Sequence, residues 1–394
     1  MIYTMFMDKM APGILRLSVM DNDIDLFEGQ YPVPQGVSYN SYLIEDDRLC
    51  LLDTVDARKQ EEWLAGLDEV LAGRKLDYLV ISHMEPDHAG SIAALCARQP
   101  QLKLVANART FAILDQFSGD NPLAQERVTV ADGGTLALGS HTLHFVLAPM
   151  VHWPEVMAVY EDREKVLFSA DGFGNFGSLT DTDAWADEAR RYYGNIVGKY
   201  GAQVQALLKK AAALEIETIC PLHGPVLTGE ALGEALRLYD LWSRWQSESP
   251  DDILLAHASI HGNTARAAEL FKQKLEAKGA RVTLCDLTTT EVSYAVANAF
   301  YCGKLVLACS TYDGGLFPPM EEFLSHLQAK GFRDRSVGLM ENGSWAPAAA
   351  RLMRAELEKM KDLRLCETEV SLRGALNQTS EAQMDALVAE LCAE

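Results

Sequence analysis

The chain has 394 residues, of which 48% are hydrophobic and 23% are charged, so it is expected to fold as a globular protein of two domains. Its formal net charge of −21 argues against nucleic-acid binding, which needs a basic surface, and no apolar run approaches the roughly 20 residues that span a bilayer. The N-terminus lacks the pattern of a signal peptide, so we expect a cytoplasmic protein.

The first half of the chain alternates short strand-like runs with turns. Residues 38–54 predict a hairpin and residues 76–82 a buried strand. Four more strands are expected, and a helical pattern with apolar residues three and four apart follows over 181–214, before a last short strand at 216–225. The four strands are 102–107, 141–149, 156–162 and 165–171. This half is therefore predicted to be α+β.

A polar, proline-containing stretch at 245–252 marks the predicted boundary, with one domain over 1–248 and another over 249–394. Beyond it strands and helices alternate regularly, which predicts β-α-β units and a parallel sheet. The expected strands are 253–259, 280–287, 304–310 and 336–344, and the expected helices are 263–279, 318–331 and 346–360. The carboxyl ends of these strands should form a binding rim.

The stretch LDYLVISHMEPDHAGS places four potential metal ligands directly behind an apolar run. Three further candidates each end another apolar run, as expected of ligands gathered at one rim. Isolated turn and capping roles are a plausible alternative for a single histidine but not for the whole set. The seven candidates are His83, Glu85, Asp87, His88, His152, Asp171 and His223.

Four imidazoles and three carboxylates are too many ligands for one tetrahedral ion. If one carboxylate bridges, the set supplies four contacts to each of two metals. Imidazoles mixed with hard oxygen donors favour iron or manganese, although zinc also accepts carboxylates. His141 and His144 are interpreted as strand residues.

The motif H-x-E-x-D-H, together with His152, Asp171 and His223, resembles the diiron site of the flavodiiron proteins. The resemblance implies an N-terminal αββα fold of the metallo-β-lactamase type. It also implies that His83, Glu85 and His152 bind one iron. Asp87, His88 and His223 would bind the other, and Asp171 would bridge the two. Tyr193 falls where that family often places an aromatic residue near the irons, with half-buried helix packing as the alternative.

Three loops of the second half suit a phosphate and a flat ring. The loop after 253–259 offers hydroxyl and amide groups at a helix N-terminus but no basic residue, which suits a single phosphate better than a polyphosphate. An ordinary capped turn is the alternative. With two later loops it resembles, in kind and order, the loops by which flavodoxin-like domains hold FMN. The predicted contacts are Ser259, Ile260, His261, Gly262, Asn263, Thr264, Ser310, Thr311, Tyr312, Asp313, Gly314, Gly315, Asn342, Gly343, Ser344 and Trp345.

The match has two departures. His261 stands where such loops often carry an aromatic residue, and ENGSWAP replaces the commoner Gly-Ser-aromatic-Gly-Trp pattern. FMN in a doubly wound, flavodoxin-like parallel sheet remains the expectation.

Together the two halves imply an oxidoreductase that reduces O2 to water, NO to N2O, or both, at two irons fed by FMN. None of the eight cysteines forms a C-x-x-C pair, so no rubredoxin centre is expected and an external donor, rubredoxin or a flavin reductase, is implied. The resemblance further implies a head-to-tail homodimer, or a dimer of such dimers, in which each flavin faces the partner's irons. A β-lactamase-fold hydrolase fused to an electron carrier is the alternative enzyme, and a flavin carrier with a relict metal site is a third interpretation.

Overall fold

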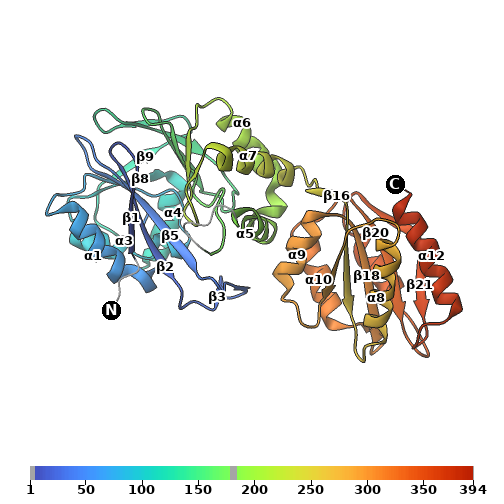
Figure 1. The fold of residues 1–394 in the computed structure, drawn as a ribbon. Coiled ribbons are helices and arrows are strands. Elements are labelled where there is room, and N and C mark those ends of the chain that lie inside the picture. The colour runs from blue at the N-terminus through green and yellow to red at the C-terminus, as the bar shows by residue number, and fades with distance from the viewer. Residues whose placement is uncertain (1–4, 178–183, 394) are drawn as a thin grey trace. The chain divides into compact units, whose positions relative to one another are not determined.

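The computed structural model describes residues 5–177 and 184–393. By their contacts these residues divide into two units (Figure 1). The first takes the described residues of Met1–Tyr192 and Ala202–Asp240, and the second those of Tyr193–Gly201 and Leu241–Glu394. Within the described part of the chain, no helix has both the length and the apolar character needed to cross a membrane.

The first unit contains two main sheets packed face to face. One has the order β1-β2-β5-β6-β7-β8-β9 and the other β10-β11-β12-β13-β14-β15. The strands of the first are β1 (Met5–Ala11), β2 (Ile14–Asp21), β5 (Val37–Ile44), β6 (Cys50–Leu52), β7 (Tyr78–Val80), β8 (Lys103–Asn107) and β9 (Arg127–Val130). Those of the second are β10 (Thr135–Ala137), β11 (Thr142–Leu147), β12 (Met157–Glu161), β13 (Val166–Phe168), β14 (Thr218–Cys220) and β15 (Leu227–Thr228). A small hairpin adds β3 (Leu26–Phe27) and β4 (Tyr31–Pro32).

The core between these sheets follows the two-residue period of the strands. Tyr42 and Ile44 of β5 and Met157 and Val159 of β12 belong to one buried cluster. The predicted hairpin over 38–54 is confirmed, because β5 pairs antiparallel with β6. Strands β6, β7 and β8 run parallel, as do β13 and β14, and it is after β7, β13 and β14 that candidate ligands follow.

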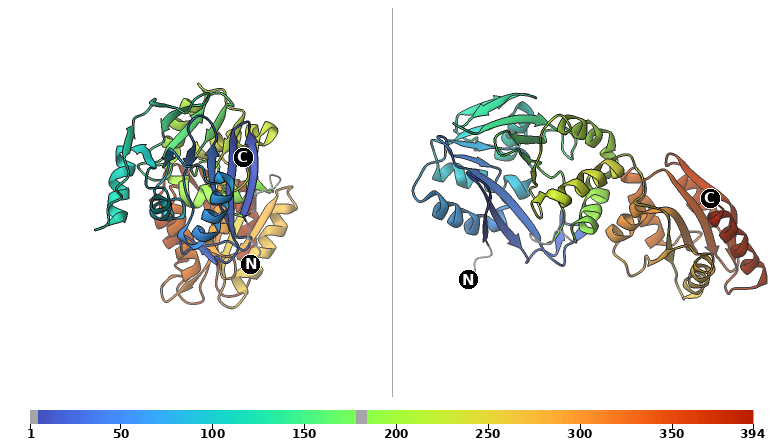
Figure 2. Two further views of the ribbon diagram at one scale, coloured as in Figure 1. Left: turned by 90° about the vertical axis from the view of Figure 1, so that its left-hand side faces the viewer. Right: turned by 45° about the horizontal axis from the view of Figure 1, so that its top comes forward.

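Helices lie outside the two sheets, which confirms the αββα prediction (Figures 1 and 2). Apart from the helical segment predicted over 181–214, these helices were not expected from the sequence. The helical elements up to residue 243 are η1 (Ala57–Lys59), α1 (Gln60–Leu71), α2 (Pro86–Ala89), α3 (Ile92–Arg98), α4 (Ala108–Ser118), α5 (Trp185–Tyr192), η2 (Tyr193–Val197), η3 (Gly198–Tyr200), α6 (Gly201–Ala211) and α7 (Gly229–Ser243).

The helical pattern predicted over 181–214 is interrupted in the structure. A π-helical turn and a 3₁₀ turn separate α5 from α6, in a stretch with glycines at 194, 198 and 201, and glycine is a poor helix former. The predicted start at 181–183 lies outside the described residues.

The second unit holds a parallel sheet with the strand order β17-β16-β18-β20-β21. In chain order this is 2-1-3-4-5, the doubly wound flavodoxin-like arrangement, so this prediction is confirmed. The strands are β16 (Ser249–Ala258), β17 (Val282–Asp286), β18 (Cys302–Tyr312), β20 (Arg335–Asn342) and β21 (Leu363–Leu372), and the short β19 (Gly315–Leu316) pairs antiparallel with β18.

Helices cover both faces of this sheet (Figure 1). α8 (Asn263–Glu276) and α12 (Gln378–Cys392) contribute to the core on one face. α9 (Val292–Tyr301), α10 (Pro318–Ala329) and α11 (Ala349–Leu357) contribute on the other. α9, β21 and α12 were not predicted from the sequence, and β21 is an edge strand that is interrupted by charged residues and lacks a continuous apolar run.

Candidate functional site

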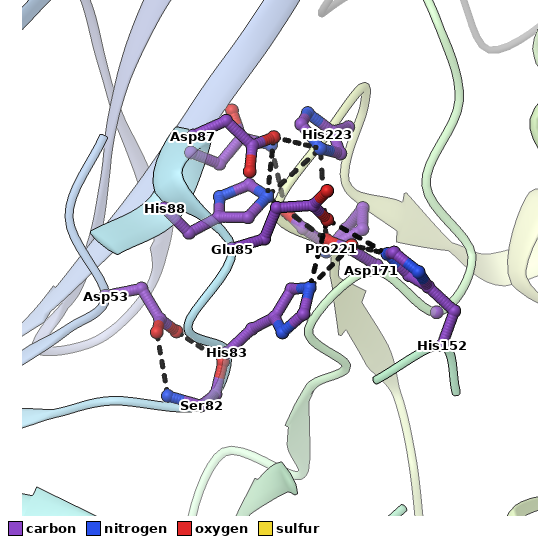
Figure 3. A network of polar contacts seen from close by, with 12 residues as sticks. Asp53, Ser82, His83, Glu85, Asp87, His88, His152, Asp171, Pro221 and His223 are labelled. Carbon is purple, nitrogen blue, oxygen red and sulfur yellow. Dashed lines mark hydrogen bonds and ion pairs between the residues drawn. The ribbon is translucent and has the colours of Figure 1, made fainter. Parts of the chain in front are cut away.

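The seven candidate metal ligands come from four separate stretches of the first unit and meet at one place (Figure 3). Three stretches follow strands β7, β13 and β14, and the fourth connects β11 to β12. His83 and Glu85 lie in the loop after β7, Asp87 and His88 in α2, His152 before β12, Asp171 after β13 and His223 after β14. All are buried except Glu85, whose side chain is 13% exposed.

Four of these side chains form the first group. The Nε2 atom of His83 lies 3.2 Å from Oε2 of Glu85 and 3.3 Å from Oδ2 of Asp171. The Nε2 atom of His152 lies 3.0 Å from each of the same two oxygens. Ligand atoms that each lie about 2.0–2.2 Å from one metal ion are separated from each other by distances of this size, so this group has the spacing of a coordination site.

The second group contains Asp87, His88 and His223. Oδ2 of Asp87 lies 3.2 Å from Nε2 of His88 and 3.1 Å from Nε2 of His223. These two imidazole nitrogens are 3.0 Å apart. The group therefore presents two imidazoles and one carboxylate to a common point.

Asp171 connects the two groups through its two oxygens. Oδ2 faces His83 and His152, whereas Oδ1 lies 3.1 Å from Nε2 of His88 and 3.8 Å from Nε2 of His223 (Figure 3). Oδ1 of Asp171 and both oxygens of Asp87 are buried without a hydrogen-bond partner among the described residues. Buried carboxylate oxygens without such partners fit metal coordination, so the residues present suit two cations with a shared carboxylate.

In the absence of a metal ion, the carboxylates of the cluster favour the protonated form of its imidazoles. Burial opposes charging of the imidazoles, but the carboxylates of Asp87 and Asp171 raise the pKa of His88 to about 10. Burial likewise lowers the pKa of His152. The hydrogen bonds of His152 to Asp171 and Glu85 outweigh the effect of burial and raise this pKa to about 9. Metal ligation requires neutral imidazoles, so metal binding must displace these protons.

The metal-free protein should therefore lose stability as the pH is raised. Imidazoles whose pKa is raised on folding stabilise the fold fully below their ordinary pKa of about 6.5, and that contribution disappears as the pH passes 9 to 10. We expect the melting temperature of chelator-treated protein to fall between pH 7 and pH 10. Metal-loaded protein should show no such fall, and equal slopes for both forms would contradict proton binding by the cluster.

Several residues that sequence analysis did not identify support the ligands. Asp53 accepts hydrogen bonds from the backbone N–H of Ser82 (2.7 Å) and from its hydroxyl (2.6 Å), which anchors the loop directly before His83 (Figure 3). The Nδ1–H of His223 donates to the backbone oxygen of Ser38 at 2.7 Å. Only the fold brings these partners together, since they lie 29 and 185 positions apart in the chain.

Two tyrosines lie beside the cluster, Tyr192 and Tyr39, whose ring is 6.0 Å from that of His223, and the predicted Tyr193 is not one of them. The ring of Tyr192 lies 5.7 Å from that of His223, and its buried hydroxyl has no hydrogen-bond partner among the described residues. Burial, followed by the charges of Asp171 and Glu85, raises the pKa of Tyr192 well above its usual range. Tyr193 belongs to the second unit, where its ring packs 5.3 Å from that of Trp242, because adjacent residues of a helical segment point in different directions.

His141 and His144 lie away from the cluster. His141 precedes β11 and donates from Nδ1 to Glu161 at 3.0 Å, and His144, within β11, pairs with Asp162.

The second unit has a cavity of about 660 Å³ at the carboxyl ends of β16, β18 and β20. Of the predicted contact residues, Gly262 and Gly315 do not line it, and Ala346 and Gly374 line it unpredicted. Gly374 follows the unpredicted strand β21. It exchanges two hydrogen bonds of 2.9 Å with the Asn342 side chain.

The loop before α8 places hydroxyl groups at the N-terminus of this helix. Gly262 stands at the N-cap with φ +86°, a conformation that glycine adopts freely, and its N–H donates to the Ser259 hydroxyl at 3.1 Å. The hydroxyls of Thr264 and Ser310 are 2.8 Å apart in the buried floor. Hydroxyls and helix N–H groups converge here as a phosphate requires.

Comparison with known proteins agrees with this geometry. A family model described as "ODP family beta lactamase" matches residues 37–224. The nitric oxide reductase of Moorella thermoacetica is 28% identical over 362 residues, which cover 89% of each chain. The solved structure of rubredoxin oxygen:oxidoreductase from Desulfovibrio gigas is 25% identical with a TM-score of 0.91 over 98% of each chain. The flavodiiron protein of Giardia intestinalis, 24% identical, shares the fold with a TM-score of 0.89 over 98% of each chain.

The fold and the site define a two-domain class in which a metallo-β-lactamase-like metal domain precedes a flavodoxin-like domain. Over nearly its whole length the chain is similar to proteins of the flavodiiron family.

Proposed function

We propose that this protein reduces dioxygen to water, nitric oxide to nitrous oxide, or both, with iron in the metal cluster and FMN in the cavity of the second unit. The observation that carries the proposal is the Asp171 carboxylate, whose two oxygens face two separate ligand groups. The names of the relatives, a nitric oxide reductase and a rubredoxin oxygen:oxidoreductase, support the substrates.

The ligands divide naturally between two irons. His83, Glu85 and His152 would hold one, Asp87, His88 and His223 the other, and Asp171 would bridge them. When bound, a ferrous pair and a reduced flavin would supply the electrons. Coupling of two NO molecules to N2O consumes two electrons, and reduction of one O2 to two waters consumes four. The chain's own residues provide the buried setting, and the Tyr192 hydroxyl is available to donate a hydrogen bond at the cluster.

The flavin pocket is proposed for FMN because its phosphate-binding part is small. The loop from Ser259 to Thr264 carries no lysine or arginine, and the hydroxyls of Thr264 and Ser310 are suited to one terminal phosphate. The volume of about 660 Å³ is within the usual range for cofactor sites.

Electron transfer requires the flavin to approach the irons. The cavity rim exposes apolar side chains, with Trp345 90% exposed and Tyr312 45% exposed. Exposed aromatic residues of this kind favour a protein contact. We therefore keep the head-to-tail homodimer, or a dimer of such dimers, as the proposed assembly.

An external donor, rubredoxin or a flavin reductase, would reduce the flavin. The protein would act in the cytoplasm. The functional domains would be 1–248 and 249–394, with β16 starting the second at Ser249.

The test is direct. Protein purified without oxygen from iron-replete cells should contain about two irons and one FMN per chain, in line with seven ligands sharing one bridge and a single flavin cavity. With chemically reduced flavin it should consume O2 or NO. Zinc alone, together with ester or lactam hydrolysis, would favour the hydrolase alternative, which the reductase names of the relatives do not support.

A further inference from the structure

A buried glutamate outside the ligand set contacts the ring nitrogen of His83 that faces away from the other ligands. Glu155 lies three residues after His152, and its side chain is fully buried. Its Oε1 atom accepts a hydrogen bond from Nδ1 of His83 at 2.8 Å and another from the backbone N–H of Met84 at 3.0 Å. One carboxylate oxygen thus orients the His83 ring and the loop that carries Glu85.

These contacts determine how His83 meets a metal. With Nδ1–H donated to Glu155, the lone pair of Nε2 points into the cluster, where Nε2 lies 3.2 Å from Glu85 and 3.3 Å from Asp171. The Glu155 backbone is itself held, because Asn107 donates from Nδ2 to its carbonyl oxygen at 2.7 Å. Asn107 is the N-cap of α4, so the support extends into a helix.

Among the described residues, neither histidine of the second group donates a hydrogen bond from Nδ1 to a carboxylate. Nδ1 of His223 donates to the neutral backbone carbonyl of Ser38, and Nδ1 of His88 is buried without a hydrogen-bond partner among the described residues. The two groups therefore differ in the Nδ1 partners of their histidines, with a carboxylate only at His83, although each group offers two imidazoles and one carboxylate besides Asp171.

We propose that Glu155 is a positioning residue that makes the two metal ions electronically unequal, by lowering the reduction potential of the ion that His83 binds. A carboxylate that accepts a hydrogen bond from a ligating imidazole makes that imidazole a stronger electron donor to the metal. This favours the ferric over the ferrous state. This inference rests on the proposed diiron function. It predicts that the iron of the second group is reduced first and that of the first group last.

The test replaces Glu155 by glutamine, which keeps an acceptor for His83 and Met84 but removes the negative charge. An EPR-monitored redox titration of iron-loaded protein should show the two one-electron steps moving closer together and a smaller maximum of the mixed-valent signal. Competition with a chelator should show iron affinity lowered by about 10–100-fold.

Glu161→Gln is the matched control. Glu161 is also fully buried and also accepts from a histidine Nδ1 (His141, 3.0 Å) and from the backbone N–H of Arg163, but it lies away from the cluster. The Glu161→Gln variant should leave the reduction potentials of the two irons and the iron affinity unchanged. If Glu155→Gln fails to fold, Asn107→Asp serves instead, because it keeps the helix-capping oxygen but removes the donor to the Glu155 backbone oxygen and so should loosen the placement of Glu155 and lower iron affinity.

The outcomes separate this inference from the proposed function. Wild-type protein that binds two irons, with a Glu155→Gln variant of unchanged potentials and affinity, would overturn the role of Glu155 alone. Wild-type protein that cannot be loaded with iron would overturn the diiron function itself.

Discussion

Replacing Asp171 by alanine is expected to empty the metal cluster, whereas replacing Glu85 by alanine should leave part of the metal bound. Asp171 faces both ligand groups, with one oxygen toward His83 and His152 and the other toward His88. Of the two ligand groups, Glu85 forms ion pairs with the first, through His83 and His152. Outer-shell changes alone cost about 10–100-fold in metal affinity, so loss of a ligand shared by both ions should exceed that range.

Iron content after anaerobic desalting, followed by turnover with O2 and with NO, measures the difference. Asp162→Ala is the control, since this exposed carboxylate pairs with His144 outside the cluster and should have no effect. Full iron content and activity in the Asp171→Ala variant would show that the loop after β13 does not belong to the site.

Mixing two inactive variants should restore about one quarter of wild-type activity if the dimer is head-to-tail and subunits exchange at random. The first variant, Thr264→Glu, places a negative charge and a larger side chain against the proposed phosphate position. Thr264 is buried at the first turn of α8, and its hydroxyl lies 2.8 Å from that of Ser310, so the change should exclude an anion there. Its metal cluster, in the other unit, should remain loaded.

The second variant combines His83→Ala with Asp171→Ala and should retain flavin without iron. Each parent should be inactive, while a mixed dimer pairs an intact flavin on one chain with intact irons on the other. Thr264→Ser, which keeps the hydroxyl, is the control that should bind FMN and turn over alone. If mixed dimers form but activity stays absent, electrons pass within one chain and the head-to-tail arrangement is wrong.

Sequence alone determined the fold class and the candidate ligands because both depend on local patterns. The run YLVIS followed by HMEPDH marks a buried strand whose end carries ligands, and regular alternation of strands and helices predicts the parallel sheet of the second unit. Among the elements that were missed, the helices α1, α7 and α12 and the edge strand β21 are partly exposed, and the patterns of such elements are weaker and depend on what covers them.

Tertiary structure decided which side chains complete the site. The choice of Tyr192 over Tyr193 depends on the direction in which each ring leaves a helical segment that changes to a π-helical turn at Tyr193, which spacing along the chain does not specify. The partners of His83 and His223, namely Glu155 and the Ser38 carbonyl, lie 72 and 185 positions away from them in sequence. Such contacts arise only when loops at the ends of two packed sheets meet, so the chemistry of the ligands could be predicted from their residue types, whereas their orientation could not.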